Sequence, residues 1–431
     1  MTTSSGSQGT PARVMGTVDA ATIGAGAMIG AGVFAVFAPA ADEAGAWLPV
    51  ALLIAGLVAY CNATSSARLA ARHPQSGGSY VYGRERLGEL WGYLAGWAFI
   101  VGKTASCAAM AMTFAAYAWP AGGSWAAAGA VVVLAGISHR GIRATALVTR
   151  FLLVVVLVVL GVSVAVSLGG GAAQFERLSL TSHWPGFFGL LGAAGMLFFA
   201  FAGYARIATL GAEVRRPERT IPRAISVALG FVLLVYLLVG VSALTVLGHS
   251  SLSESSAPLV DTVAAAGWPS LGGFVRVGAA FASLGALLTL LLGVSRTVHA
   301  LAGDRNLPWF LARVHGRFAV PYRAQWAVAL VVCVLVLLVD LPSAIGFSAF
   351  GVLVYYAIAN ASALRLGPEE NRPPLLVPVG GLTGCVVLAF SLPLTSVVPG
   401  VTVLLAGGLA WLLTRFLHRR GWAGGQSSPR G

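Results

Sequence analysis

Residues 24–32 read Gly24-Ala-Gly-Ala-Met-Ile-Gly-Ala-Gly32 and lie inside an apolar run that extends from about residue 18 to residue 40. A second run, at 186–212, contains Gly192-Ala-Ala-Gly195 followed by Phe198-Phe-Ala-Phe-Ala-Gly-Tyr204. Glycine weakens a helix because it leaves the backbone unrestricted. We therefore expect an interrupted helix in each run. Close packing on a neighbouring helix remains the alternative for the first run, because its glycines include a GxxxG motif.

The composition places these runs in a membrane. Of the 431 residues, 57% are hydrophobic and only 10% are charged, whereas soluble proteins carry roughly 25% charged residues. A helix needs about 20 residues to cross the hydrocarbon layer. Apolar runs of about this length predict an all-α polytopic membrane protein with 12 transmembrane helices, at 18–40, 47–70, 90–118, 124–138, 146–168, 186–212, 223–247, 270–300, 324–340, 343–365, 376–394 and 397–417.

The positions of the 27 basic residues predict the orientation of the chain. Loops rich in arginine and lysine stay in the cytoplasm. With both termini cytoplasmic, only Arg177 and Arg276 lie on the outer side, so we expect a multi-pass protein of the plasma (inner) membrane. The net charge of +13 does not indicate nucleic-acid binding, because the basic residues fall between apolar runs rather than on one surface.

The order of the runs predicts the domain organisation. The two glycine-interrupted runs each open a set of five spans, at 17–168 and 186–366, and the two sets cross the membrane with opposite topology. This pattern predicts a five-plus-five inverted repeat with broken helices 1 and 6, which is typical of secondary transporters. We expect residues 1–16 to be a disordered cytoplasmic N-terminus, 17–366 the core, 375–418 two peripheral spans and 419–431 a cytoplasmic tail.

Motifs for enzymatic chemistry are missing from the sequence. The four cysteines lie singly in apolar runs without CxxC spacing, and the seven histidines form no HxxxH pair. Neither a nucleophile elbow nor a phosphate-binding loop is present. We therefore predict no catalytic residues, no metal site, no cofactor and no enzymatic activity.

Several motifs together resemble the amino acid–polyamine–organocation (APC) superfamily of permeases. They occur in the expected order and spacing over residues 16 to 310, and they are Gly26-Ala-Met-Ile-Gly-Ala-Gly-Val-Phe34, Pro74-Gln-Ser-Gly-Gly-Ser-Tyr-Val-Tyr82, Gly96-Trp97, Phe198 to Tyr204, Glu213 to Pro222, and Ser295-Arg296 through Asp304 to Pro308. The resemblance implies alternating access around a site between spans 1, 3, 6 and 8.

The resemblance also implies which residues bind substrate. Backbone N–H groups of Met28, Ile29, Gly30, Ala31 and Gly32 would hold an α-carboxylate, and a half-helix N-terminus suits such an anion. Carbonyl groups freed near Ala25, Gly26, Phe201, Ala202 and Gly203 would accept hydrogen bonds from the α-ammonium. Phe199 occupies the position of an aromatic residue that closes over the substrate, and Phe201 and Tyr204 would suit an apolar side chain.

Charged and polar residues inside the spans are candidates for ion coupling. Many members of the superfamily carry a lysine in span 5, where this sequence has Val156. Lys103, the only lysine, lies in the middle of span 3 and is too far from either end to reach water. A charge at this depth is costly and marks a functional site by default. A structural lysine bound to freed carbonyl groups is the alternative. Ser283 and Thr289 of span 8 could offer hydroxyl groups to a small ion, and Arg206 fits a cytoplasmic anchor.

These features predict a permease that moves a small, neutral α-amino acid by alternating access. Lys103 would gain and lose a proton and so link transport to protons, without sodium. The alternatives are an exchanger for amino acids of another charge class and a non-transporting amino acid sensor or partner subunit. The expected partners are the amino acid, a proton and the lipid bilayer, but not nucleic acid. The sequence leaves the oligomeric state open.

Overall fold

The computed structural model describes residues 15–73, 77–140, 146–181, 184–208, 214–316, 318 and 320–423. The regular structure of these residues is helical, apart from one β-bridge between Met15 and Val214. The predicted disordered ends fall largely outside this part of the chain. The helices of the first half are α1 (Thr17–Met28), α2 (Gly32–Ala35), α3 (Phe37–Ala44), α4 (Leu48–Arg72), α5 (Ser79–Leu87), α6 (Glu89–Ala118), α7 (Gly123–His139) and α8 (Ala146–Gly169).

The second half of the chain continues the helical bundle. Its helices are α9 (Gly186–Phe201), the 3₁₀ turn η4 (Ala202–Tyr204), α10 (Ala205–Ala208), α11 (Pro217–Ser253), α12 (Pro258–Ala265), α13 (Gly272–Gly303), α14 (Tyr322–Leu338), α15 (Leu341–Leu364), the 3₁₀ turn η7 (Pro368–Glu370), α16 (Leu376–Ser391) and α17 (Leu394–Ala423).

Helix length and composition make this a multi-pass membrane protein. Ten helical segments in the described residues are long and apolar enough to cross a membrane. The runs predicted at 324–340 and 376–394 form the apolar helices α14 and α16, which have 17 and 16 residues. Both are shorter than the about 20 residues of a typical spanning helix. Large apolar side chains are exposed along the outer helices, as a surface that faces lipid requires.

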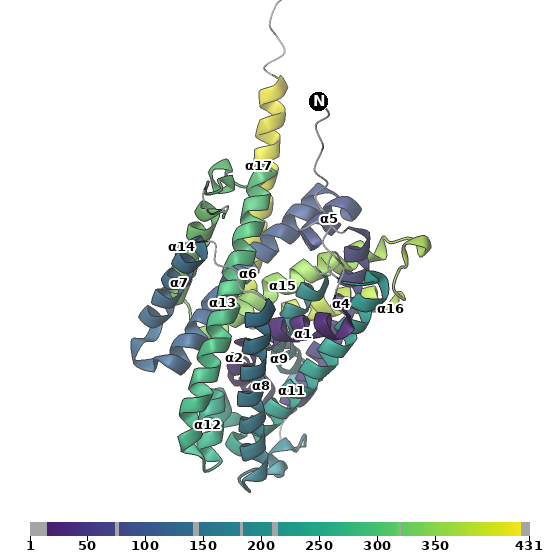
Figure 1. Cartoon of the computed structure of the whole chain (residues 1–431). Helices are drawn as coiled ribbons and strands as arrows, with labels where there is room; N and C mark the ends of the chain where they lie inside the picture. Colours follow the sequence, from purple (N-terminus) through teal and green to yellow (C-terminus); the bar gives the residue numbers. More distant parts are fainter. Residues whose placement is uncertain are drawn as a thin grey trace, which may run out of the picture.

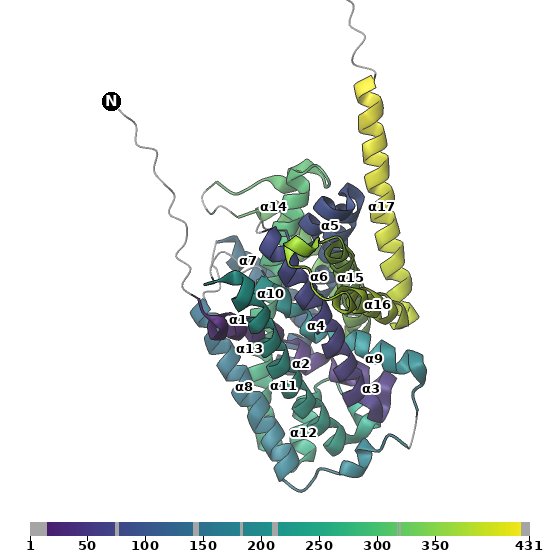
Figure 2. The same ribbon diagram turned by 90° about the vertical axis from the view of Figure 1, so that its right-hand side faces the viewer.

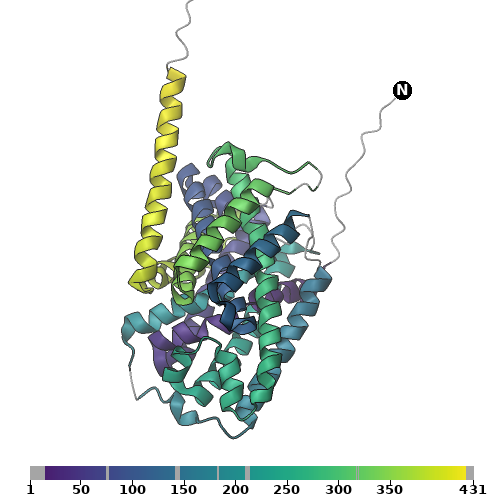
Figure 3. The same cartoon turned by 90° about the vertical axis from the view of Figure 1, so that its left-hand side faces the viewer.

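The bundle has two ends that carry different short helices. Figures 1 and 2 show α12 at the lower end and α5 at the upper end, and we call these the α12 side and the α5 side. Helix α17 extends beyond the bundle on the α5 side. Helices α7, α13 and α14 pack on one another and run between the two ends (Figure 3).

Helix α6 lies at the centre of the core and packs along both α13 and α15. Its backbone approaches α15 closely where Gly102 faces Gly351, since a Cβ atom added to Gly351 would lie 2.8 Å from the Gly102 Cα. The hydroxyl groups of Ser106 and Ser348 are 2.6 Å apart and join the same two helices. These contacts fix the position of the middle of α6, which contains Lys103.

Candidate functional site

The first helix break falls within the glycine-rich run, as predicted. Helix α1 ends at Met28 and α2 begins at Gly32. The Ile29 amide donates to the Ala25 carbonyl at 2.7 Å, and the Gly30 amide donates to the Met28 carbonyl at 2.9 Å. Within the described part of the chain, no acceptor bonds the amide N–H groups of residues 31–33. These donors are therefore available to an anionic ligand.

The second break lies directly against the first. Helix α9 ends at Phe201, and the 3₁₀ turn η4 changes the helical pitch before α10. A Cβ atom on Gly203 would lie 2.1 Å from the Ala27 carbonyl oxygen, and one on Gly32 would lie 3.0 Å from the Ala200 Cα. Only glycine permits this approach of backbone to backbone. The glycines thus both interrupt the helices and allow the two segments to pack closely.

One tyrosine of α11 contacts carbonyl groups of both breaks. The Tyr236 hydroxyl, on α11, donates to the Met28 carbonyl at 2.8 Å and lies 3.2 Å from the Ala200 carbonyl. Tyr236 is fully buried, so this hydroxyl gives carbonyl groups of both breaks a polar neighbour inside the membrane, where water is absent. This residue was not predicted as part of the site. The signal was a single polar aromatic residue within the apolar run Phe-Val-Leu-Leu-Val-Tyr-Leu-Leu-Val at 231–239.

Accessibility differs between the two sides of the first break. Ala27 is exposed, and Gly26 and Gly30 are partly exposed, whereas every residue of α2 is buried. Gly30 faces α13, because a Cβ atom there would lie 3.3 Å from the Ala286 Cβ. The predicted binding residues Ala25, Met28, Ile29 and Ala31 are buried beside these positions. The structure therefore brings the predicted residues of span 1 together next to span 8.

The predicted aromatic residues of span 6 are divided among different neighbours. The Phe201 ring packs edge-on against Tyr236 with centroids 5.2 Å apart. The Tyr204 ring lies 5.0 Å from the Tyr356 ring of α15. Both rings are therefore engaged in packing on helices behind the break. Phe199 is 8% exposed, and its ring pairs with no other ring in the described residues.

Lys103 is buried in α6 without a partner for its charge. Its ammonium has no hydrogen bond or ion pair with any residue that the structure describes, including the carbonyl groups of the breaks. The carbonyl groups of Met28 and Ala200 are instead bonded by Tyr236. A buried, unpartnered ammonium is costly, so this geometry suits a group that can lose its proton.

The two hydroxyl groups predicted in span 8 lie in different environments. Ser283 is fully buried, and its hydroxyl has no hydrogen-bond partner in the described residues. The Thr289 hydroxyl donates to the Gly285 carbonyl of its own helix at 2.9 Å and is exposed. The structure does not bring them together. Arg206, the predicted anchor, is exposed on α10, and Val156 is buried in α8.

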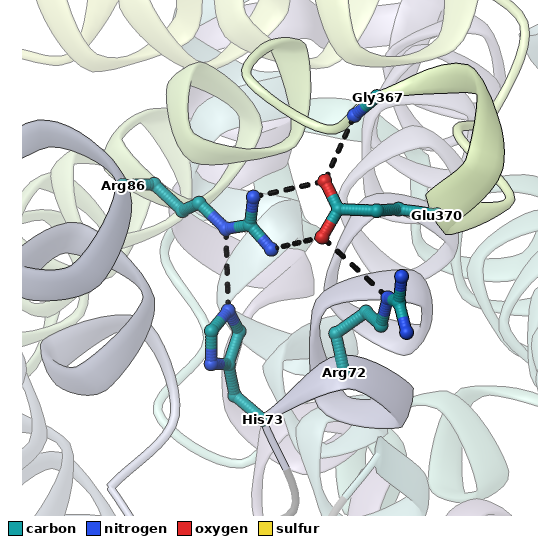
Figure 4. Close-up of polar contacts among 5 residues, drawn as sticks. All are labelled: Arg72, His73, Arg86, Gly367 and Glu370. Carbon is teal, nitrogen blue, oxygen red and sulfur yellow. Dashed lines mark hydrogen bonds and ion pairs between the residues drawn. The ribbon is translucent and has the colours of Figure 1, made fainter.

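A cluster of charged side chains joins three segments on the α5 side (Figure 4). Both terminal nitrogens of Arg86 donate to the carboxylate of Glu370. The Gly367 amide donates to Glu370 Oε2 at 2.9 Å, and Arg72 Nε lies 3.5 Å from Oε1. Arg86 Nε also donates to His73 Nε2 at 3.2 Å. This cluster, which we call the Glu370 clasp, ties the end of α4 and α5 to the η7 turn.

The clasp changes the titration of its members. The hydrogen bonds from Arg86, followed by that from the Gly367 amide, lower the pKa of Glu370 to about 2. Burial and the nearby Arg86 guanidinium lower the pKa of His73 below its usual range. Glu370 also borders an open cavity of about 310 Å³ between α4, the start of α11 and η7. At neutral pH the Glu370 carboxylate is thus ionised and His73 is neutral.

Comparison with known proteins defines the class. The chain belongs to the amino acid permease family, because a family model of that description matches residues 15–413. It is 57% identical over 411 residues to an uncharacterized transporter of Mycobacterium tuberculosis, covering 95% of this chain and 92% of that protein. A branched-chain amino acid permease of Bacillus subtilis is 25% identical over 435 residues, covering 94% and 90%. Cationic amino acid transporter 4 of Homo sapiens is 28% identical over 399 residues, covering 84% and 61%. The chain is therefore a transporter and not an enzyme, as predicted.

Proposed function

We propose that this permease is a secondary transporter of small, neutral α-amino acids that works by alternating access. The observation that carries the proposal is the contact between the two helix breaks, which places unbonded amide N–H groups beside freed carbonyl groups. A zwitterion needs donors for its carboxylate and acceptors for its ammonium. The two breaks offer both within one small region.

In this proposal the backbone binds the common part of every amino acid. The unbonded N–H groups at 31–33 bind the carboxylate, where the N-terminal end of α2 adds positive partial charge. Carbonyl groups of Ala25, Gly26 and residues 201–203 bind the ammonium. Phe199 closes over the substrate and contacts its side chain. The glycines leave room for these contacts, because they carry no side chains.

The charges near the breaks favour a neutral substrate. In the described residues of α1, α2, α9, η4 and α10, the only acid is Asp19, which pairs with Arg150 at the α5 side. A cationic side chain would lack a counter-charge at the depth of the breaks, and Lys103 would repel it. The Bacillus subtilis relative is named for branched-chain amino acids, which agrees with a neutral substrate.

The proposed membrane topology of the protein has twelve spans, an inverted repeat of five plus five, and both termini in the cytoplasm. Counting α14 and α16 as short spans gives twelve. The α5 side is the cytoplasmic side, because arginines cluster at the ends of α4, α5, α7, α13 and α15 there, whereas the α12 side has Arg177 and Arg276 in its described residues. The host membrane is the plasma membrane.

Lys103 is the proposed coupling residue. Its ammonium has no fixed counter-charge among the described residues, so deprotonation relieves the cost of burying a charge. It would release a proton when the site opens to one side and bind one when it opens to the other. Ser283, whose buried hydroxyl has no partner in the described residues, is the second candidate coupling residue.

Uptake into proteoliposomes tests this function. Purified protein would be reconstituted with an imposed proton gradient, and uptake of labelled leucine and alanine would be measured with arginine and putrescine as competitors. We expect uptake of neutral amino acids that rises with the proton gradient and is independent of sodium. Micromolar competition by arginine without any by leucine would instead identify an exchanger or permease for cations. Binding without uptake under any gradient would identify a sensor.

A further inference from the structure

Tyr117 joins three helices on the α12 side of the first break. It is the second-last residue of α6 and is fully buried. Its hydroxyl donates to the Phe34 carbonyl of α2 at 2.9 Å and accepts from the Leu259 amide of α12 at 3.3 Å. Its ring packs edge-on against the Phe34 ring, with centroids 5.6 Å apart. One side chain thus bonds the helix that follows the break and the short helix that covers this side.

A fourth helix holds the backbone of the same residue. Arg276 Nη1 of α13 donates to the Tyr117 carbonyl at 2.9 Å. This carbonyl lies in the last turn of α6, where it has no partner within the helix. The Leu259 amide is likewise in the first turn of α12 and lacks a helical partner. Tyr117 therefore satisfies groups that helix ends leave unpaired, and burial makes the loss of either bond costly.

We propose that Tyr117 is the gate residue that holds the binding site closed on the α12 side. This inference rests on the proposed function, since alternating access requires this side to open. For α2 to separate from α6, the hydroxyl bond to the Phe34 carbonyl must break, and for α12 to move away from α6, the bond from the Leu259 amide must break as well. The residues of α2 are all buried in the present structure, so the structure represents the state with this gate shut.

The Tyr117→Phe variant isolates the hydroxyl group. It keeps the ring that packs on Phe34 but removes both hydroxyl bonds, so the closed state loses stability relative to the open state. Two hydrogen bonds of this kind make only a modest net contribution to the stability of the closed state, because the same groups can bond to water when the gate opens. We expect the ratio of open to closed molecules to rise about tenfold, which corresponds to about 1.4 kcal/mol.

Cysteine labelling from outside the cell reads this ratio directly. Ala35 of α2 is buried, with 4% exposure, and Ala35→Cys places a thiol behind the gate. A membrane-impermeant thiol reagent would be added to intact cells, with the parent protein lacking this cysteine as background. We expect the Ala35→Cys protein with Tyr117 intact to be labelled slowly, and the same protein with Tyr117→Phe to be labelled about ten times faster. The matched control is Tyr93→Phe on the same helix, which removes a buried hydroxyl without a bond to another described helix.

The outcomes separate this inference from the proposed function, because labelling needs no substrate. Equal labelling rates for Tyr117→Phe and for its Tyr93→Phe control, with both proteins folded, would overturn the gate. Failure of amino acid uptake with faster labelling would overturn the substrate assignment and leave the gate supported. If Tyr117→Phe does not fold, Phe34→Leu tests the same gate from α2, because it removes the ring that packs on Tyr117, and unchanged labelling there would equally refute it.

Discussion

Replacing Gly203 by alanine tests the contact between the two helix breaks. The new Cβ atom would lie 2.1 Å from the Ala27 carbonyl oxygen and 2.7 Å from the Met28 amide nitrogen. Ordinary contact begins near 3.4 Å, so the two segments would have to separate by about 1.3 Å. Both obstructing atoms belong to backbone, which cannot rotate away as a flexible side chain could. We expect a loss of about 1–3 kcal/mol in the free energy of unfolding, which is typical of overpacking.

A second glycine provides the matched control for this variant. Gly230 is exposed on α11, and a Cβ atom there would meet nothing within 4 Å. Gly230→Ala should therefore stabilise the protein by about 0.5–1 kcal/mol, because alanine restricts the unfolded chain. Thermal unfolding in detergent would compare the two variants with the parent, and uptake of labelled leucine would be measured in proteoliposomes.

The unfolding temperature and the uptake rate together test whether the two breaks are in contact. Gly203→Ala should lower both the unfolding temperature and the uptake rate, because the displaced break no longer presents its backbone groups to substrate. Gly230→Ala should lower neither. A Gly203→Ala protein with the parent's stability and uptake would show that the breaks do not touch as described.

Three further predictions concern the site and the clasp. Gly30→Val should abolish amino acid binding while membrane insertion persists, because its side chain would meet Ala286 at 3.3 Å or less; parent-like uptake by this variant would contradict carboxylate binding at the first break. Lys103→Ala and Lys103→Met should lose the dependence of uptake on the proton gradient, and a parent-like pH profile in both would make Lys103 structural. Glu370 has a pKa lowered to about 2 from 4.5, so its stabilising contribution is complete above pH 4.5 and is lost as the pH falls towards 2. Glu370→Gln should therefore lower the unfolding temperature by a constant amount between pH 7 and pH 5, and a difference that grows on acidification would refute this assignment.

The helix breaks could be predicted from sequence because their cause is local. Glycines at 24–32 and 192–203 weaken the helix wherever the chain lies, and the structure places the interruptions within or directly after these runs. The membrane class was equally predictable, because it follows from composition. The exact ends of α14 and α16 were not, since the run at 324–340 begins and ends two residues after α14 and the run at 376–394 continues beyond the end of α16.

The orientation of individual side chains could not be predicted in the same way. Phe201 is the last residue of α9 and Tyr204 the last residue of η4, where 3₁₀ geometry changes the angle between successive residues. A count based on 3.6 residues per turn therefore misplaces the side chains beyond the break, and both rings pack against α11 and α15. The partners of Tyr236 and Glu370 lie far away in sequence, so only the folded chain brings them together.

The hydroxyl of Tyr236 has a single proton and two carbonyl acceptors, on Met28 and Ala200. It can form only one strong hydrogen bond at a time, and the shorter distance assigns that bond to Met28. If α1 moves away from α11, the same proton can turn to Ala200, so the number of bonds is conserved. By this change of acceptor, α1 can move away while the hydrogen bond to α9 becomes stronger. The displacement of α1 therefore costs less than the loss of an isolated hydrogen bond inside a membrane.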